Sequence, residues 1–116
     1  MGSVEEKIQS ALSDSGLPVY FSACKEPVRP PQYITWTMAL IAVELYGDDL
    51  PLELGFYIQV SLWSKTEYFA VAETIRSSMQ AAGFQIKDER DLEYDPETQY
   101  YGRNQRYFYL NGSDGT

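Results

Sequence analysis

The sequence predicts an α+β fold, a two-layer sandwich in which two helices cover one face of a mixed or mostly antiparallel sheet. Two segments carry apolar residues at helical spacing, several others have strand-like composition or alternation, and turn signals separate them in the order α-β-β-β-α-β-β. The chain has 116 residues, of which 44% are hydrophobic. That is enough for one core, so we expect a single domain over 1–116 with a flexible tail at 110–116.

The N-terminal segment predicts a helix over residues 4–15. Ser3 and Glu6 have the spacing of a capping box, and Gly16 is a C-terminal stop signal. The apolar residues that share one helical face are Val4, Ile8, Ala11 and Leu12. A short apolar run at 17–21 then indicates a strand.

Residues 22–32 contain three prolines and predict a loop. The segment 33–46 is rich in β-branched and aromatic residues and predicts a strand, although its part 38–43 would also suit a helix. After a turn signal near Gly47, residues 56–63 alternate apolar and polar side chains and predict a further strand.

The second helix is predicted from Ser64, which has Glu67 three residues later in a second capping-box spacing, to the stop signal Gly83. Its apolar stripe consists of Tyr68, Ala72, Ile75, Met79 and Ala82. Residues 84–94 and 99–110 flank a turn signal that contains Pro96, so they predict a terminal antiparallel hairpin.

Composition excludes several classes of function. The formal net charge of −8 disfavours specific binding of nucleic acid or of an anionic membrane, and no apolar run approaches the ~20 residues of a membrane span. The chain has no histidine and a single cysteine, Cys24. With no imidazole base beside it, Cys24 is better explained as a small structural side chain than as a nucleophile. We expect no enzyme activity, no metal and no cofactor in this intracellular protein.

An acidic run precedes and enters the last turn. Its carboxylates are Asp88, Glu89, Asp91, Glu93, Asp95 and Glu97. A calcium loop that began at Asp91 would need glycine and glutamate where Pro96 and Gly102 stand, so this motif does not fit. Alternate carboxylates from 89 to 97 would lie on one face. They would either keep an edge strand soluble or form a patch that repels a polyanion.

Tyrosine is abundant, with ten residues in the chain. Four of them fall in the last predicted strand: Tyr100, Tyr101, Tyr107 and Tyr109. Tyrosine is common both on half-buried sheets and at protein interfaces. Packing on the sheet explains the pattern, whereas exposed rings would favour an oligomer.

Three stretches together resemble the tail-terminator (tail-completion, neck) proteins of long-tailed bacteriophages. They are PVRPPQYITWT at 27–37, FYIQVSLWSKTEYFAVAETIRSSMQAAGF at 56–84 and RYFYL at 106–110. With the first helix, the resemblance covers about residues 4–110. It implies a structural virion protein without catalytic residues, made in the cytoplasm of the bacterial host. Such proteins form rings, generally sixfold, that cap the tail tube and join it to the head connector or stopper protein.

The resemblance gives two surface regions an expected role. The hairpin of 33–63 should project beyond the sheet and pack on the neighbouring subunit of the ring, or else fold back on its own sheet. Its apolar contact residues would be Leu45, Tyr46, Leu50 and Leu52. The acidic residues of 88–97 would face the lumen, where like charge repels passing DNA.

A second class of protein has a similar sequence profile. Small acidic chaperones of type III secretion share the size, the low pI and the order of elements. They dimerise and bind an extended effector segment through apolar patches. A stable dimer in solution would favour a chaperone, whereas a monomer or a ring would favour a tail terminator.

Overall fold

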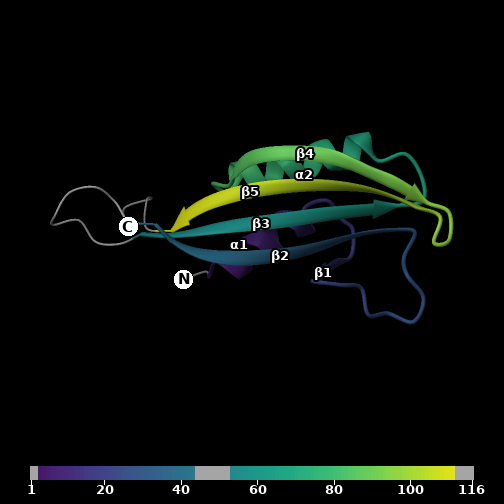
Figure 1. Ribbon diagram of the computed structural model, residues 1–116, viewed down its shortest axis with the longest axis horizontal. Coiled ribbons are helices and arrows are strands. Elements are labelled where there is room, and N and C mark those ends of the chain that lie inside the picture. Colours follow the sequence, from purple (N-terminus) through teal and green to yellow (C-terminus); the bar gives the residue numbers. More distant parts are fainter. Residues whose placement is uncertain (1–2, 44–52, 112–116) are drawn as a thin grey trace, which may run out of the picture.

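The computed structural model describes residues 3–43 and 53–111 and confirms the α+β fold, with elements in the predicted order (Figure 1). The elements are α1 (Val4–Ser13), β1 (Val19–Phe21), β2 (Gln32–Val43), β3 (Glu53–Ser64), α2 (Phe69–Ala81), β4 (Gln85–Asp95) and β5 (Tyr100–Asn111). The segment 38–43, which would also have suited a helix, is strand throughout.

The five strands form one mixed sheet in the order β1-β2-β3-β5-β4. β1 runs parallel to β2, and all other neighbouring strands are antiparallel. Because β3 and β4 both pair antiparallel with β5, they run in the same direction, and α2 connects them. The short β1 and the long β4 are the edge strands.

Both helices pack on one face of the sheet, as predicted. In Figure 1, α1 lies with β2 and β3, and α2 lies with β4 and β5. Their buried side chains join those of the central strands in one core. The fully buried side chains of this core include Ile8, Leu12, Ile34, Ile58, Val60, Ile75, Met79, Phe84 and Tyr107. The opposite face of the sheet carries no helix in the described part of the chain.

The pairing of β2 with β3 gives the molecule its length. It is continuous from Gln32 opposite Ser64 to Val43 opposite Glu53, and the molecule measures 54 × 27 × 25 Å. The predicted hairpin of 33–63 is therefore confirmed as two paired strands. Its four proposed contact residues, Leu45, Tyr46, Leu50 and Leu52, lie outside the described residues.

The first capping box is confirmed. The Ser3 hydroxyl oxygen accepts a hydrogen bond from the Glu6 backbone N–H at 3.1 Å, and the Glu6 carboxylate accepts one from the Ser3 N–H at 3.0 Å. The helix ends at Ser13, two residues earlier than predicted, and Gly16 follows with a left-handed φ of 80°.

The second capping box was wrong. α2 begins at Phe69, and Ser64 is the fully buried last residue of β3. The Ser64 hydroxyl accepts hydrogen bonds from Gln32 Nε2 at 2.9 Å and from the Thr66 N–H at 3.1 Å. The Ser64 hydroxyl therefore cannot cap a helix that starts at residue 65. It binds Thr66 in the turn that follows β3.

The terminal hairpin forms as predicted, with β4 and β5 joined through residues 96–99. β5 includes Leu110 and Asn111, the first two residues of the segment predicted as a flexible tail. The rest of that segment lies outside the described residues.

Gly102 in β5 is predicted to tolerate no side chain. A Cβ atom there would lie 2.9 Å from Leu92 Cδ1 and 3.0 Å from Trp63 Cζ3. The indole cannot easily move, because its Nε1 donates to Thr35 Oγ1 at 3.0 Å. We expect Gly102→Ala to lower the free energy of unfolding by about 1–3 kcal/mol, measured by urea denaturation.

A second substitution tests the cause of this loss. Leu92→Ala removes the nearest clashing atom, so the double variant Gly102→Ala/Leu92→Ala should lose less stability than the sum of the two single variants. If the loss of stability in the double variant equals the sum of the two single losses, the clash with Leu92 is not the cause of the loss in Gly102→Ala.

Candidate functional site

The acidic segment 88–97 lies on β4 and the turn that follows it, but its carboxylates do not share one face as predicted. Glu89 and Asp91 are the register partners of Gln105 and Arg103 and lie on the helix-covered face. Glu93 lines a hollow on the opposite face. The cause is an irregularity in the pairing of β4 with β5 between Leu92 and Asp95, which interrupts the alternation of side chains.

Glu89 is the centre of an ionic network between α2, β4 and β5. Its carboxylate is 15% exposed and accepts from Arg76 Nη1 at 2.7 Å, from Arg103 Nε at 2.9 Å and from Gln105 Nε2 at 2.8 Å. The same Gln105 amide donates to the backbone oxygen of Ala72 at 3.1 Å. The edge strand is thereby attached to the helix above it and to its neighbouring strand.

Two tyrosines extend this network. Tyr107 is fully buried and its hydroxyl donates to Gln105 Oε1 at 2.5 Å. Tyr68, at the start of α2, donates to Asp91 Oδ1 at 2.9 Å, and Arg103 Nη1 donates to the same oxygen at 2.6 Å. Each of these polar side chains therefore has a hydrogen-bond partner, which is what polar groups that are shielded from water need.

The environment shifts the pKa values of the network in the directions that its contacts imply. Burial by itself raises the pKa of Glu89, but hydrogen bonds from Arg103, Arg76 and Gln105 outweigh burial and lower it to about 2. Asp91 behaves in the same way, with its pKa lowered mainly by Arg103 and Tyr68. Burial raises the pKa of Tyr107, so its hydroxyl stays a donor.

The remaining carboxylates of the segment divide into two kinds. Asp88 forms an ion pair with Arg106 on the open face of the sheet, which lowers its pKa. Glu93, Asp95 and Glu97 have no ion pair to another described residue, and all three are exposed. Arginines from other elements, Arg76, Arg103 and Arg106, thus compensate part of the charge of this acidic run.

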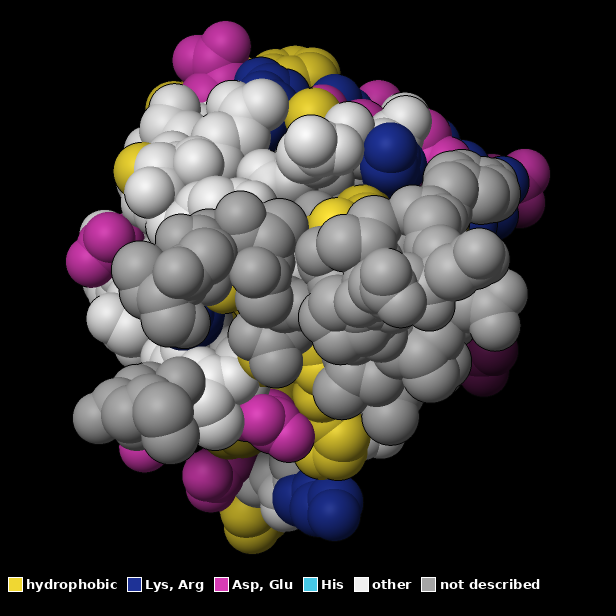
Figure 2. Space-filling view, turned by 90° about the vertical axis from the view of Figure 1, so that its left-hand side faces the viewer, with side chains coloured by type: hydrophobic (Ala, Val, Ile, Leu, Met, Phe, Trp, Pro, Cys, Tyr) yellow, Lys and Arg dark blue, Asp and Glu magenta, His cyan; other side chains and the backbone are white. Residues whose placement is uncertain are grey.

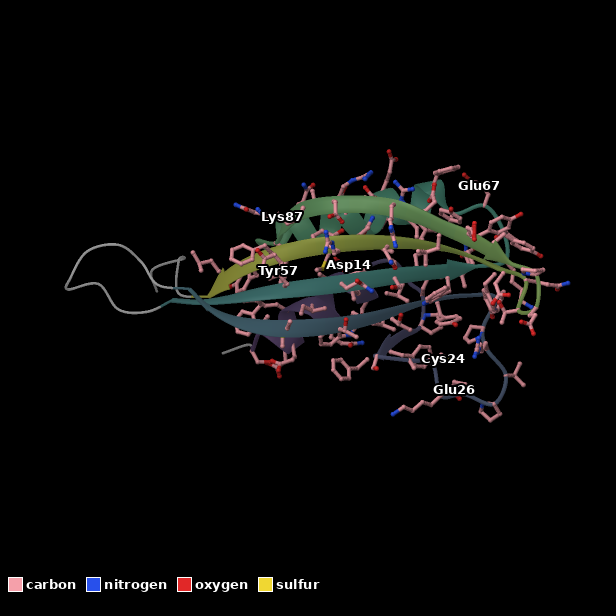
Figure 3. All side chains as sticks on the ribbon, in the orientation of Figure 1. Asp14, Cys24, Glu26, Tyr57, Glu67 and Lys87 are labelled. Atoms are coloured by element: carbon pink, nitrogen blue, oxygen red, sulfur yellow. The ribbon has the colours of Figure 1, made fainter. Side chains whose placement is uncertain are left out.

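Cys24 lies in the loop between β1 and β2 (Figure 3). It lines a hollow of about 290 Å³ on the open face, together with Tyr33, Trp63, Glu93 and Asp95 among others. Within residues 3–43 and 53–111, no group of three or more Cys, Asp or Glu side chains is placed to hold a metal ion. None of the described helices is long and apolar enough to cross a membrane.

Four aromatic side chains form a cluster at the end of the molecule where β3 ends and α2 begins, and we call it the aromatic patch. Its members are Tyr68, Phe69, Tyr94 and Tyr101. Phe69 is 58% exposed, Tyr94 44% and Tyr101 43%. The tyrosines of β5 therefore divide: Tyr100, Tyr107 and Tyr109 are buried in the sheet as packing predicts, whereas Tyr101 is at the surface.

The opposite end of the molecule is where β2 ends and β3 begins. Figure 2 shows carboxylate and basic side chains distributed over the described surface seen from this end, with hydrophobic side chains between them. Tyr57, which is 44% exposed, lies nearer to this end, and Glu67 lies at the other (Figure 3). Exposed aromatic residues thus occur at several places among the described residues, and three of them, Phe69, Tyr94 and Tyr101, lie together in the aromatic patch.

Comparison with known proteins identifies the fold. No protein-family model matches the sequence, and no curated protein matches it either. The structure, however, is similar to a chain of the virion of a native gene transfer agent (GTA) particle. The match has a TM-score of 0.64 and covers 94% of each chain at 11% sequence identity. The two chains share a fold.

The ionic network predicts a pH dependence of stability. The pKa of Glu89 in the folded protein lies below its ordinary value of 4.5, so its contribution is complete above about pH 5 and is lost as the pH falls towards 2. We expect Glu89→Gln to lower the free energy of unfolding at pH 7 by about 1–3 kcal/mol, because it leaves two arginines without this partner.

Urea denaturation between pH 7 and pH 3 measures this effect. The difference between the wild type and Glu89→Gln should shrink as the pH falls. The control is Asp88→Asn, which removes an exposed ion pair and should change stability little at any pH. If both substitutions lower the free energy of unfolding equally at pH 7, Glu89 contributes no more to stability than an exposed ion pair does.

Proposed function

We propose that this chain is a structural protein of a phage-like virion, which forms a ring that caps the tail tube and joins it to the head connector. The observation that carries the proposal is the likeness of fold to a GTA virion chain over 94% of both chains. The resemblance of three sequence stretches to tail terminators supports the same role. The partners would be further copies of the chain, the tail tube protein and the connector or stopper protein.

The distribution of polar groups agrees with a role in assembly. The buried or half-buried polar side chains of the Glu89 network are bound to one another and to backbone, so in the described structure they connect elements and present no free base or nucleophile. The exposed side chains of the described residues include aromatic rings and charged groups of both signs, among which carboxylates outnumber lysines and arginines. Such surfaces suit contacts with proteins and repulsion of DNA better than turnover of a substrate.

The direct test is a joining assay. Heads and tails from a phage that lacks this gene product should remain separate, and addition of the purified protein should join them. The substitutions Tyr46→Ser and Leu50→Ser should together reduce joining at least tenfold while leaving the circular dichroism spectrum unchanged, because we propose that these residues contact the neighbouring subunit.

Two results would contradict the proposal. If the wild-type protein does not join heads to tails, it is not a tail terminator. If the purified protein is instead an obligate dimer that binds an extended secreted polypeptide, the protein belongs with the secretion chaperones. Normal joining by the Tyr46/Leu50 variant would show only that the arm is not an interface.

Of the six carboxylates that the sequence assigned to the ring lumen, only three remain candidates. The carboxylates of Asp88, Glu89 and Asp91 are compensated by arginines. Glu93, Asp95 and Glu97 are exposed and lack such partners among the described residues. In the proposed ring these three residues of each copy face the lumen and repel the DNA that passes through it.

Reversal of this charge tests the lumen assignment. We expect Glu93→Lys, Asp95→Lys and Glu97→Lys together to slow DNA ejection from assembled virions, because a basic lining holds DNA through release of its counterions. The matched control reverses three exposed carboxylates outside this segment, Glu5, Asp14 and Glu26. Ejection at the wild-type rate in the first variant, or equal slowing in both, would exclude a lumen position for these residues.

A further inference from the structure

The aromatic patch has the composition and the exposure of a protein-binding surface. Its rings contact each other, with centroids 4.7 Å apart for Tyr94 and Tyr101 and 5.4 Å apart for Tyr68 and Phe69. Beside them is a hollow of about 410 Å³, whose lining includes Phe69, Tyr101 and Lys65. Clustered aromatic side chains around a hollow are typical of the residues that dominate protein interfaces.

The base of the patch is rigid, because the Glu89 network supports it. The Tyr68 hydroxyl is bound to Asp91, which is in turn bound to Arg103. A binding surface on such a support loses little conformational freedom when a partner docks. The patch is therefore organised before it binds, and its partner must supply apolar groups that fit between aromatic rings.

The chain itself contains a segment of matching chemistry. Residues 44–52, which connect β2 to β3, read ELYGDDLPL. They supply three leucines, a tyrosine and a proline for contact with aromatic rings, and three carboxylates without any lysine or arginine. Lys65, whose Nζ lies 5.2 Å from the Tyr100 ring centroid, and the exposed Glu67 both line the hollow beside the patch, so the match between segment and patch rests on their apolar and aromatic side chains.

The dimensions of the molecule prevent this segment from reaching the patch of its own chain. The segment is anchored at Val43 and Glu53, which are paired across β2 and β3. Nine residues held at both ends extend about 17 Å at most. The patch begins beyond Ser64, at the other end of β3, about 40 Å away at the usual rise of a strand. Only a second copy can bring the two together.

We propose that the aromatic patch of each copy receives residues 44–52 of the neighbouring copy. Because the two surfaces lie at opposite ends of β3, the contact joins unlike surfaces and repeats from copy to copy, the arrangement that closes into a ring when the rotation allows. This inference rests on the proposed function for the ring, and it adds the surface that receives the projecting segment.

Disulfide trapping between separate copies tests the contact. In a Cys24→Ser background, one protein carries Leu50→Cys and a second, of different mass through a tag, carries Phe69→Cys. Neither can form the tested bond within one chain. After the two are mixed and oxidised, we expect the Leu50→Cys/Phe69→Cys product at least fivefold above a control in which Tyr57→Cys, a comparably exposed aromatic position, replaces Phe69→Cys. An equal or lower yield would overturn the proposal.

The joining assay separates failure of this inference from failure of the proposed function. Phe69→Ser should reduce head-to-tail joining at least tenfold, and the control Tyr57→Ser should not, with folding of both checked by thermal denaturation. If folded Phe69→Ser protein joins heads to tails as the wild type does, the patch is not the receiving surface, although the function stands. If the wild type itself joins nothing, the proposed function is wrong.

Discussion

The continuous twelve-residue pairing of β2 with β3 organises the sheet and, through it, the whole molecule. It sets the long dimension of the molecule and provides the central strands that β1 and β5 extend. Because the helices cover only one face, the described side chains of these strands differ between the two sides: Ile58 and Val60 belong to the core, whereas the open face mixes polar residues with Tyr33 and Trp63. The same pairing separates the two ends of β3, so any contact between those ends must involve two copies.

The edge strand β4 shows how one acidic segment can serve two purposes. Charged residues on an edge strand keep it from pairing with other sheets. Here Glu89 and Asp91 point beneath α2 and bind arginines, which fixes the edge to the helical layer. The later carboxylates, from Glu93 to Glu97, keep their charge exposed. The proposals of a structural edge and of a repulsive surface therefore apply to different residues of the same strand.

The amino-acid pattern predicted the fold well where the signal is local. The capping box at Ser3, the apolar stripe from Ala72 to Met79 and the alternation of β3 all depend on short spacing, and the structure contains them. The same kind of signal failed at Ser64, because the hydroxyl had a competing partner in Gln32, 32 residues away.

The candidate site was less predictable, because it depends on pairings between elements. The opposition of Asp91 to Arg103 and of Asp88 to Arg106 could have been found by aligning the two strands of the predicted terminal hairpin. The contact of Arg76 with Glu89 could not, since it depends on how α2 packs. The bulge of β4 could not either, since it is a shift of register in a strand that contains neither glycine nor proline. The aromatic patch likewise combines residues from the start of α2 with residues from β4 and β5.

Cryo-electron microscopy of the neck of intact virions would show where this chain lies and what its residues contact. We expect a ring of copies of this chain between the tail tube and the head connector, in which residues 44–52 of each copy lie against Phe69 and Tyr101 of the next. A particle without this chain at the neck, or a ring in which those residues contact only their own subunit, would contradict this expectation.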